Sequence, residues 1–338
     1  MSVPVVFTTE RSARHQDNAL QMAPDGFAIT MLRAPDTAQL HAALAGARYL
    51  ISERRGEIGA DLLDASPDLA MVLRLGSMAH DIDLSEAARR NIIVCQRSQE
   101  GAMRVAEHLM LQILALLKRL METEAIARAA ADDWAERHTT DENTFAFNWS
   151  RQERLYGLHD STVGILGFGE IGAELARRLA GWRCNILYHR RTRLPEQAEA
   201  QLGVGFCSRE ELAARSDVVV CLLPYTPQTQ VSVDASLLAH MKPGALLASA
   251  GSGGVIDEQA LAQAVLAGHL AGAAVDTFAV EPIESGNPLV IAAREGANML
   301  LTPHVAGGAP DDGWQELADM YGPIQEHLAG QAPSGRLV

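Results

Sequence analysis

Aromatic residues, cysteines and basic residues are all scarce in this chain of 338 residues. The four cysteines form no CxxC pair, so no metal site is expected, and the usage is typical of a reducing, cytoplasmic compartment. The N-terminus lacks a basic region followed by an apolar one, so no signal peptide is predicted. The longest apolar stretch, HLMLQILALL, is too short to cross a bilayer and indicates a buried helix.

Acidic residues outnumber basic ones, 42 against 28, which gives a net charge of -14. An acidic surface repels phosphate backbones and anionic lipids, so we expect neither nucleic acid nor a membrane as a partner. Hydrophobic residues make up 48% of the chain, enough for large buried cores, and the length suggests two domains. A small molecule is the expected ligand.

Short apolar runs alternate with helical segments along most of the chain. The first hundred residues contain PVVFTT, FAITML, ARYLIS, LAMVLRL and NIIVCQ, and a second series runs from Ser161 to Ala309. Such alternation predicts an α/β protein with doubly wound parallel sheets covered by helices. Residues 103–136 form one long helical pattern that would connect two domains, and residues 311–330 form one more helix.

A polar insertion at residues 139–157 separates the long helical pattern from the second series of strands. It holds four of the scarce aromatic residues, Phe145, Phe147, Trp149 and Tyr156. Aromatic side chains at this density indicate packing against another surface. The insertion is interpreted as a clamp on its own domain, a lid or a dimer arm, and we favour packing or dimer contact over a lid.

A glycine fingerprint, GxGxxG, directly follows an apolar strand and opens a helix. Its glycines are Gly167, Gly169 and Gly172. The first allows the tight turn, the second lets the backbone approach a pyrophosphate, and the third lets helix and strand pack closely. A pyrophosphate would bind at the positive helix N-terminus. In this strand, turn and helix context the motif predicts a dinucleotide site.

The end of the next strand bears on the choice of cofactor. An NAD site needs an acidic residue about 20 residues further on to bind the ribose 2′-hydroxyl. The sequence NILYHRRTRLPEQ has no acid there and carries Arg190, Arg191 and Arg193 instead. Guanidinium groups bind a 2′-phosphate that a carboxylate would repel. We predict NADP(H) as the preferred cofactor, with NAD(H) as the alternative and a solvated basic turn as the other explanation.

Several ordered motifs beyond the glycine turn resemble the D-2-hydroxyacid dehydrogenase family, which includes phosphoglycerate, glyoxylate/hydroxypyruvate and formate dehydrogenases. They are VAEH at 105–108, GFGEIG at 167–172, LLPYTPQT at 222–229, GGVIDEQAL at 253–261, VDTFAVEP at 275–282 and TPH at 302–304. The resemblance implies a flavodoxin-like substrate domain at 1–107 plus 310–338 and a Rossmann domain at 108–309. It also implies a cleft between them that closes about a hinge, and a homodimer.

The resemblance also assigns the chemistry. His304 would be the general acid that protonates the carbonyl oxygen as hydride arrives, and Glu281 would orient it and raise its pKa. A histidine poised by a carboxylate is a suitable acid or base in its own right. The assigned cofactor contacts, with Thr226 beside Pro224 on the nicotinamide side, are Gly167, Phe168, Gly169, Glu170, Ile171, Gly172, His189, Arg190, Arg191, Leu223, Pro224, Thr229, Ala250, Gly251, Asp276, His304 and Gly307.

Two expected substrate-binding elements depart from the family pattern. In the loop ASAGSGGVID, Ser252 occupies the position where the family places an arginine that binds the substrate carboxylate, and Ser249 occupies that of an asparagine. In GSMAHDID, Met78 replaces a glycine and His80 an aspartate, although the N–H groups of Ser77 and Met78 remain available to an anion. A serine supplies no charge, and loss of a charge-assisted bidentate contact costs about a hundredfold in rate.

Three interpretations of this change stay open. Another arginine, Arg74, Arg97 or Arg104, compensates, with Arg74 nearest the GSM loop in sequence. Alternatively, the substrate is a bulkier or less charged carbonyl compound. In the third interpretation the chain binds nucleotide as a sensor or scaffold with little dehydrogenase activity. The retained pair of His304 and Glu281 argues against the third, since a pure binder does not need it.

Overall fold

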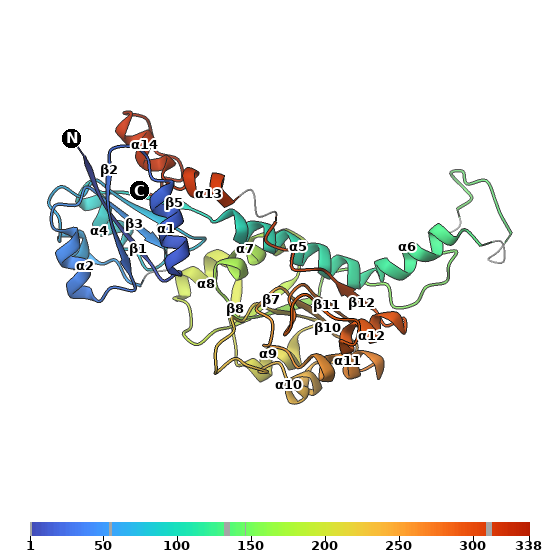
Figure 1. Ribbon diagram of the computed structural model, residues 1–338. Helices are drawn as coiled ribbons and strands as arrows, with labels where there is room; N and C mark the ends of the chain where they lie inside the picture. The colour runs from blue at the N-terminus through green and yellow to red at the C-terminus, as the bar shows by residue number, and fades with distance from the viewer. Residues whose placement is uncertain (1, 54–55, 132–135, 146, 309–312) are drawn as a thin grey trace. The chain divides into compact units, whose positions relative to one another are not determined.

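The computed structural model describes residues 2–53, 56–131, 136–145, 147–308 and 313–338. The chain divides into two compact units, each built around its own sheet (Figure 1). Unit 1 combines residues Met1–Met103 with Gly308–Val338, and unit 2 comprises Arg104–Gly307. The helix α5 (Glu100–Leu117) contains the border between them.

Unit 1 contains a five-stranded parallel sheet in the order β2-β1-β3-β4-β5. Its strands are β1 (Val3–Thr9), β2 (Phe27–Arg33), β3 (Tyr49–Glu53), β4 (Met71–Leu75) and β5 (Ile93–Arg97). Its helices are α1 (Ala13–Gln21), α2 (Thr37–Leu44), α3 (Ala60–Leu63), α4 (Leu84–Arg89), α13 (Gly313–Asp319) and α14 (Gly322–Leu328). The strand order changes direction between β1 and β3, because β2 is added on one side of β1 and β3 to β5 on the other, as in flavodoxin-like folds.

Two apolar layers cover the faces of this sheet. Side chains alternate along a strand, so Phe7 of β1 packs with Ile324 of α14, while the adjacent Val6 packs with Leu40 of α2. Figure 1 shows α1 and α14 apart from α2 and α4 around the sheet. Because both faces are covered, polar groups gather at the ends of the strands.

Unit 2 contains a seven-stranded parallel sheet in the order β12-β11-β10-β9-β6-β7-β8. Its strands are β6 (Thr162–Leu166), β7 (Asn185–His189), β8 (Val204–Phe206), β9 (Val218–Cys221), β10 (Leu246–Ser249), β11 (Gly272–Val275) and β12 (Met299–Leu301). Its further helices are α6 (Leu120–Ala129), α7 (Glu170–Leu179), α8 (Glu196–Leu202), α9 (Arg209–Arg215), α10 (Ala235–His240), α11 (Glu258–Leu266) and α12 (Pro288–Arg294), with a 3₁₀ turn at Ala180–Trp182.

The strand order of unit 2 changes direction between β6 and β9, which places the switch point of a Rossmann-type sheet directly after β6. The strands β9, β10 and β11 are buried along their whole length; β9, for example, is VVVC with every residue buried. Continuous apolar runs of this kind are typical of parallel strands covered on both faces. The predicted α/β class with two doubly wound parallel sheets is confirmed.

Two predicted helices are wrong in extent. The single helix expected at 103–136 is broken at Arg119, whose φ is +47°. The preceding carbonyls bond tertiary partners, since Leu116 O accepts from Asn298 Nδ2 and Leu117 O accepts from Tyr156 N–H, which competes with continuation of the helix. After α6 ends at Ala129 the described chain is not helical until α7.

The expected helix at 311–330 is also wrong, because α13 and α14 are separate helices. Pro323 lies in the first turn of α14. A proline there has no N–H to bond the preceding turn, and its ring disfavours helical backbone before it, so a new helix starts.

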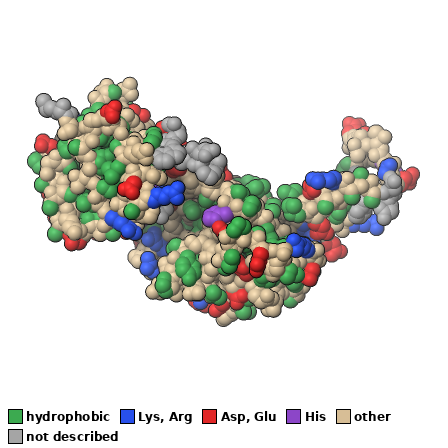
Figure 2. Space-filling model, in the orientation of Figure 1, with side chains coloured by type: hydrophobic (Ala, Val, Ile, Leu, Met, Phe, Trp, Pro, Cys, Tyr) green, Lys and Arg blue, Asp and Glu red, His purple; other side chains and the backbone are tan. Residues whose placement is uncertain are grey.

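The aromatic side chains of the insertion are exposed, although the Tyr156 N–H donates to Leu117 O of α5. Phe145 is 74% exposed and Phe147 85%, and Trp149 and Tyr156 are also exposed. The clamp interpretation is therefore wrong for Phe145 and Phe147, and a dimer contact stays a prediction. Among the helices that the structure describes, none is long and apolar enough to cross a membrane. Acidic and basic side chains are scattered together over the face shown in Figure 2.

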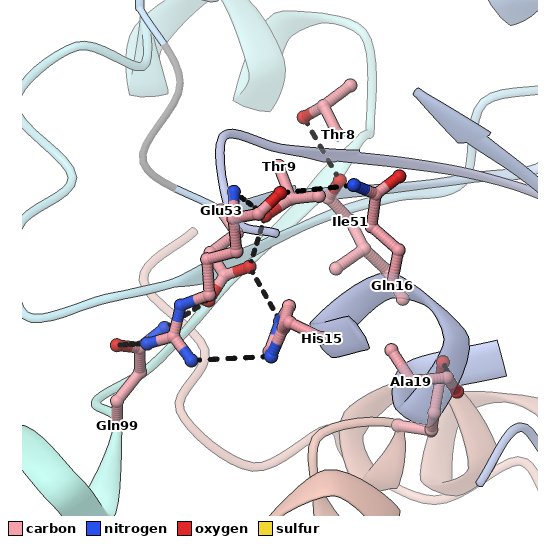
Figure 3. Close-up of polar contacts among 10 residues, drawn as sticks. Thr8, Thr9, His15, Gln16, Ala19, Ile51, Glu53 and Gln99 are labelled. Carbon is pink, nitrogen blue, oxygen red and sulfur yellow. Dashed lines mark hydrogen bonds and ion pairs between the residues drawn. The ribbon is translucent and has the colours of Figure 1, made fainter. Parts of the chain in front are cut away.

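A buried carboxylate organises one end of the unit 1 sheet (Figure 3). Glu53, 1% exposed at the end of β3, accepts from Thr9 at 2.7 Å and from Gln99, and pairs with His15 at 3.1 Å. Arg11 Nε lies 3.0 Å from the same carboxylate. Burial opposes ionisation of Glu53, but these donors outweigh it and lower its pKa to about 2.

Replacing this buried carboxylate, Glu53→Gln, should destabilise unit 1. The fall from the ordinary pKa of 4.5 to about 2 corresponds to about 3 kcal/mol. A lowered folded pKa contributes stability above pH 4.5 that is lost as the pH falls towards 2. Urea unfolding at pH 7 and at pH 3 should therefore show a smaller pH effect in the variant than in the native chain.

The matched control is Asp64→Asn, which removes a carboxylate of the same unit whose side chain is 65% exposed in its pair with Arg90. An exposed ion pair contributes little to stability, so this variant should unfold almost as the native chain does. Equal losses in the two variants would contradict the role given to Glu53.

Candidate functional site

The glycine-rich turn lies at the switch point of unit 2, between β6 and α7. Gly167 has a φ of +92°, and a Cβ there would lie 2.8 Å from the backbone of Leu222 and Leu223, so only glycine fits. A Cβ on Gly172 would approach Phe168 at 3.1 Å, which shows how closely helix and turn pack. Gly169, by contrast, has no atom within 4 Å of its Cβ position, so the approach to α7 is open.

The start of α7 faces that open space with backbone N–H groups that make no hydrogen bond within the helix. The first bond within the helix runs from Ala173 N–H to Gly169 O, so the N–H groups of the preceding turn have no helical carbonyl to bond. The N–H groups of Gly167 and Phe168 instead donate to His189 O, which holds the turn against the end of β7. Glu170 and Ile171 occupy the first turn of the helix. This arrangement fits a pyrophosphate.

Three arginines follow β7, and they differ in their partners. The guanidinium of Arg193 already has a partner, since it donates to both carboxylate oxygens of Glu199 at 2.9 and 2.8 Å. Arg190 is half-buried and Arg191 exposed, and neither guanidinium has a hydrogen bond or ion pair with a described residue. His189 at the strand end bonds Cys207 O through Nδ1 at 3.0 Å. Two uncommitted cations therefore flank this strand end.

The loop after β10 is held between its neighbours. Gly251 N–H donates to Cys221 O and Ser252 N–H to Leu223 O, both from the segment that ends β9. Thr277 donates to Gly251 O at 2.5 Å from the β11 side. A Cβ on Gly253 would overlap Phe278 O at 1.8 Å, so the glycine permits this close approach. Ser252 is half-buried, as is Ala250.

The segment after β9 forms its own polar turn. Thr229 donates to Pro224 O at 2.6 Å and accepts from Thr226 N–H at 2.8 Å. These bonds fix the path of the chain from Leu223 to Thr229. The exposed Tyr225 covers Gly254 of the neighbouring loop at 3.2 Å from its Cβ position.

His304 and Glu281 form a hydrogen-bonded pair at the ends of β12 and β11. His304 Nδ1 lies 2.8 Å from one carboxylate oxygen of Glu281, and the other oxygen accepts from Phe278 N–H at 2.9 Å. These two bonds, that from His304 first, lower the pKa of Glu281. The His304 ring is 62% exposed, and its Nε2 has no partner among the residues that the structure describes.

A buried carboxylate holds the backbone of His304. Asp276, 1% exposed at the end of β11, accepts from Thr302 at 2.6 Å and from the N–H groups of Val305 and Ala306 at 3.0 Å. His304 N–H donates to Asp276 O at 2.8 Å. These bonds hold His304 at a φ of +54°, a strained backbone conformation for a residue other than glycine.

His108 is a residue of this site to which the sequence analysis gave no role. It projects from α5, and its Nε2 lies 3.1 Å from Thr302 Oγ1 and 3.6 Å from Asp276 Oδ1. Since the Thr302 hydroxyl donates to Asp276, its oxygen accepts from His108. The VAEH motif contained this residue, but only the tertiary contact shows what the imidazole touches.

The residues predicted to bind substrate in unit 1 lie after β4. Arg74 is buried, and its guanidinium donates to Asp81 at 2.7 Å. Ser77 is fully buried, Met78 half-buried and His80 exposed. A substrate anion would therefore compete with Asp81 for Arg74, whereas the predicted use of backbone N–H groups at 77–78 stays a prediction.

Family models match both units. A D-isomer specific 2-hydroxyacid dehydrogenase NAD binding domain matches residues 110–306, and the catalytic domain of the same family matches residues 5–142. D-3-phosphoglycerate dehydrogenase of Mycobacterium leprae (strain TN) is 30% identical over 98% of this chain, which spans 58% of that protein. Glyoxylate reductase of Thermococcus kodakarensis is 34% identical over 76% of this chain and 72% of its own length.

Solved structures share the fold. The PH0520 protein from Pyrococcus horikoshii OT3 aligns over 100% of this chain and 95% of its own with a TM-score of 0.59 and 24% identity. Rhodotorula graminis D-mandelate dehydrogenase aligns over 99% and 98% with a TM-score of 0.57 and 23% identity. The resemblance inferred from the motifs is confirmed at the level of the family. The chain belongs to the D-isomer specific 2-hydroxyacid dehydrogenases, a family of NAD-binding oxidoreductases.

Proposed function

We propose that this chain reduces the carbonyl group of a 2-keto acid or a related compound, with NADPH as the preferred cofactor and His304 as the acid/base. The observation that carries the proposal is the bonded pair of His304 and Glu281 on the same sheet edge as the glycine turn. A nucleotide-binding protein without redox chemistry has no need for such a pair.

The residues after β6 and β7 fit the cofactor. Gly167, Gly169 and the first turn of α7 would hold the pyrophosphate, because that turn is open and its N–H groups point outward from the helix. Arg190 and Arg191 would hold the 2′-phosphate of NADPH, since both lack a partner in the described chain. When bound, the reduced nicotinamide supplies the hydride.

His304 would deliver the proton. With Nδ1 bonded to Glu281, the ring keeps its other nitrogen, Nε2, directed away from the carboxylate and available to a carbonyl oxygen. Glu281 has a lowered pKa and so stays ionised to acidic pH, where it stabilises the charged imidazolium. Asp276 would act as a positioning residue, since it accepts hydrogen bonds from the backbone N–H groups of His304 and of the two residues that follow it.

The loop after β10 does not by itself identify the substrate class. Ser252 supplies a hydroxyl and no charge at this edge of the sheet, so a carboxylate bound here would need a cation from elsewhere, or the substrate carries no carboxylate there. A sensor or scaffold with little dehydrogenase activity remains the alternative. Tight NADPH binding without turnover of any carbonyl compound would favour that alternative.

Residues 1–107 and 310–338 would recognise the substrate and residues 108–309 the cofactor. The exposed aromatic side chains at 145–156 would contact a second copy of the chain in a homodimer. The absence of paired cysteines in the sequence favours a cytoplasmic compartment.

Removing the acid/base, His304→Ala, should lower kcat by about 10²–10⁴-fold while NADPH still binds. Glu281→Gln should lower kcat less and change the pH profile, because a neutral amide no longer stabilises the imidazolium. Steady-state NADPH oxidation between pH 5 and 9, with nucleotide binding measured separately, tests both. Unchanged turnover in His304→Ala would refute the acid/base role.

Removing the uncommitted guanidinium groups, Arg190→Ala with Arg191→Ala, should weaken NADPH binding by about ten- to a hundredfold and leave NADH almost unchanged. Arg193→Ala is the matched control, because its guanidinium is already bound to Glu199. Titration of the two nucleotides by calorimetry separates the outcomes. Equal losses for NADH and NADPH would rule out 2′-phosphate recognition by these arginines.

A further inference from the structure

The proposed function leaves one requirement unmet in unit 2, a cation for the substrate carboxylate. Three arginines were candidates, and the structure separates them. Arg74 is buried and bonded to Asp81 at 2.7 Å, and Arg104 belongs to unit 2 and is engaged by other residues. Arg97 differs from both in its surroundings.

Arg97 lies beside the GSM loop that follows β4. It is the last residue of β5 and pairs in register with Leu75, the last residue of β4. Its carbonyl accepts from Gly76 N–H at 2.8 Å, which joins the strand end directly to the loop. The backbone of Arg97 thus adjoins the start of the loop that carries Ser77 and Met78.

Arg97 also lines a cavity of about 220 Å³ at the carboxyl ends of the unit 1 strands. The other lining residues are Arg11, His15, Glu53, Leu75, Ser98, Gln99, Glu316, Leu317 and Met320. Figure 3 shows that His15 and Gln99 point at the carboxylate of Glu53, and Arg11 Nε lies 3.0 Å from it. The positive charge of Arg11 is therefore already compensated inside the cavity wall.

The guanidinium of Arg97 is held only loosely. Among the described residues its nearest carboxylates are those of Asp319 at 3.6 Å and Glu100 at 3.8 Å, beyond hydrogen-bond distance, and its side chain is 30% exposed. It makes no hydrogen bond to any residue in the described ranges. A planar guanidinium with free donors, facing a cavity, matches a carboxylate in a bidentate arrangement.

We propose that Arg97 binds the carboxylate of the substrate, and this inference rests on the proposed function. The cavity holds one loosely paired cation and one further carboxylate, Glu316, for which no partner is seen in the described residues. A second negative charge on the ligand would meet Glu316. The walls from Leu75, Leu317 and Met320 are apolar. The substrate class is therefore a 2-keto monocarboxylate with an apolar substituent.

The test compares phenylglyoxylate with its methyl ester, which keeps the reacting ketone and removes the charge. Arg97→Ala should lower kcat/KM for phenylglyoxylate by about a hundredfold and change the ester little, because loss of a bidentate charged contact affects the acid alone. Arg97→Lys should retain part of the activity. Arg89→Ala, a 68% exposed arginine of the same unit, is the matched control.

A second variant tests whether the carboxylate of Glu316 in the cavity wall disfavours a substrate with a second negative charge. Glu316→Gln should raise kcat/KM for 2-ketoglutarate, a dianion, several-fold more than for phenylglyoxylate. Thermal unfolding of each variant shows whether the fold is kept. Folded Arg97→Ala with unchanged phenylglyoxylate turnover, or with equal losses on acid and ester, would overturn the inference and leave the proposed function standing. Absence of turnover by the native chain with every carbonyl compound would overturn both.

Discussion

Parallel pairing is the constraint on which the rest of this protein depends. Every pairing between the named strands of both sheets is parallel, so all carboxyl ends of a sheet lie at one edge. Helices bury both faces, and polar side chains can therefore gather only at the strand ends. In unit 2 this edge brings together the glycine turn after β6, the arginines after β7, and Glu281 and His304 after β11 and β12, although these segments span about 140 residues of sequence.

At that edge, the buried carboxylate of Asp276 fixes the backbone of the segment that carries His304. It takes two backbone N–H groups and one hydroxyl from the segment 302–306, and it holds His304 in a strained conformation. A buried charge is tolerated only when hydrogen bonds compensate the loss of water. For Asp276 the last of these bonds comes from the hydroxyl of Thr302, which in turn is bonded to His108 of α5. The position of the His304 ring thus depends on the buried carboxylate that holds the backbone of residues 304–306. Glu53 has the same part in unit 1, where it binds groups from β1, α1 and the segment before α5.

Motifs with a strict backbone requirement were readable from the sequence. Gly167 needs a positive φ, and Gly172 lies against Phe168, so their spacing in the sequence predicts the tight turn between β6 and α7. The prediction of a single helix at 311–330 is wrong although Pro323 is visible in the sequence. Apolar residues continue at helical spacing on both sides of this proline, so the pattern alone indicates one helix. The break at Arg119 had no local signal, since it depends on carbonyls that bond Asn298 and Tyr156.

The sequence by itself determined the family, the parallel α/β class and the site motifs, because strand periodicity, glycine spacing and the order of motifs are local properties of the chain. The tertiary structure decided which charged side chains are available. Arg74, Arg97 and Arg193 look alike in sequence, yet Arg74 is bonded to Asp81 and Arg193 to Glu199, while no carboxylate of the described residues lies closer to Arg97 than 3.6 Å. A guanidinium can bind a ligand only where the fold has left its donors unused, and that depends on residues far away in the chain.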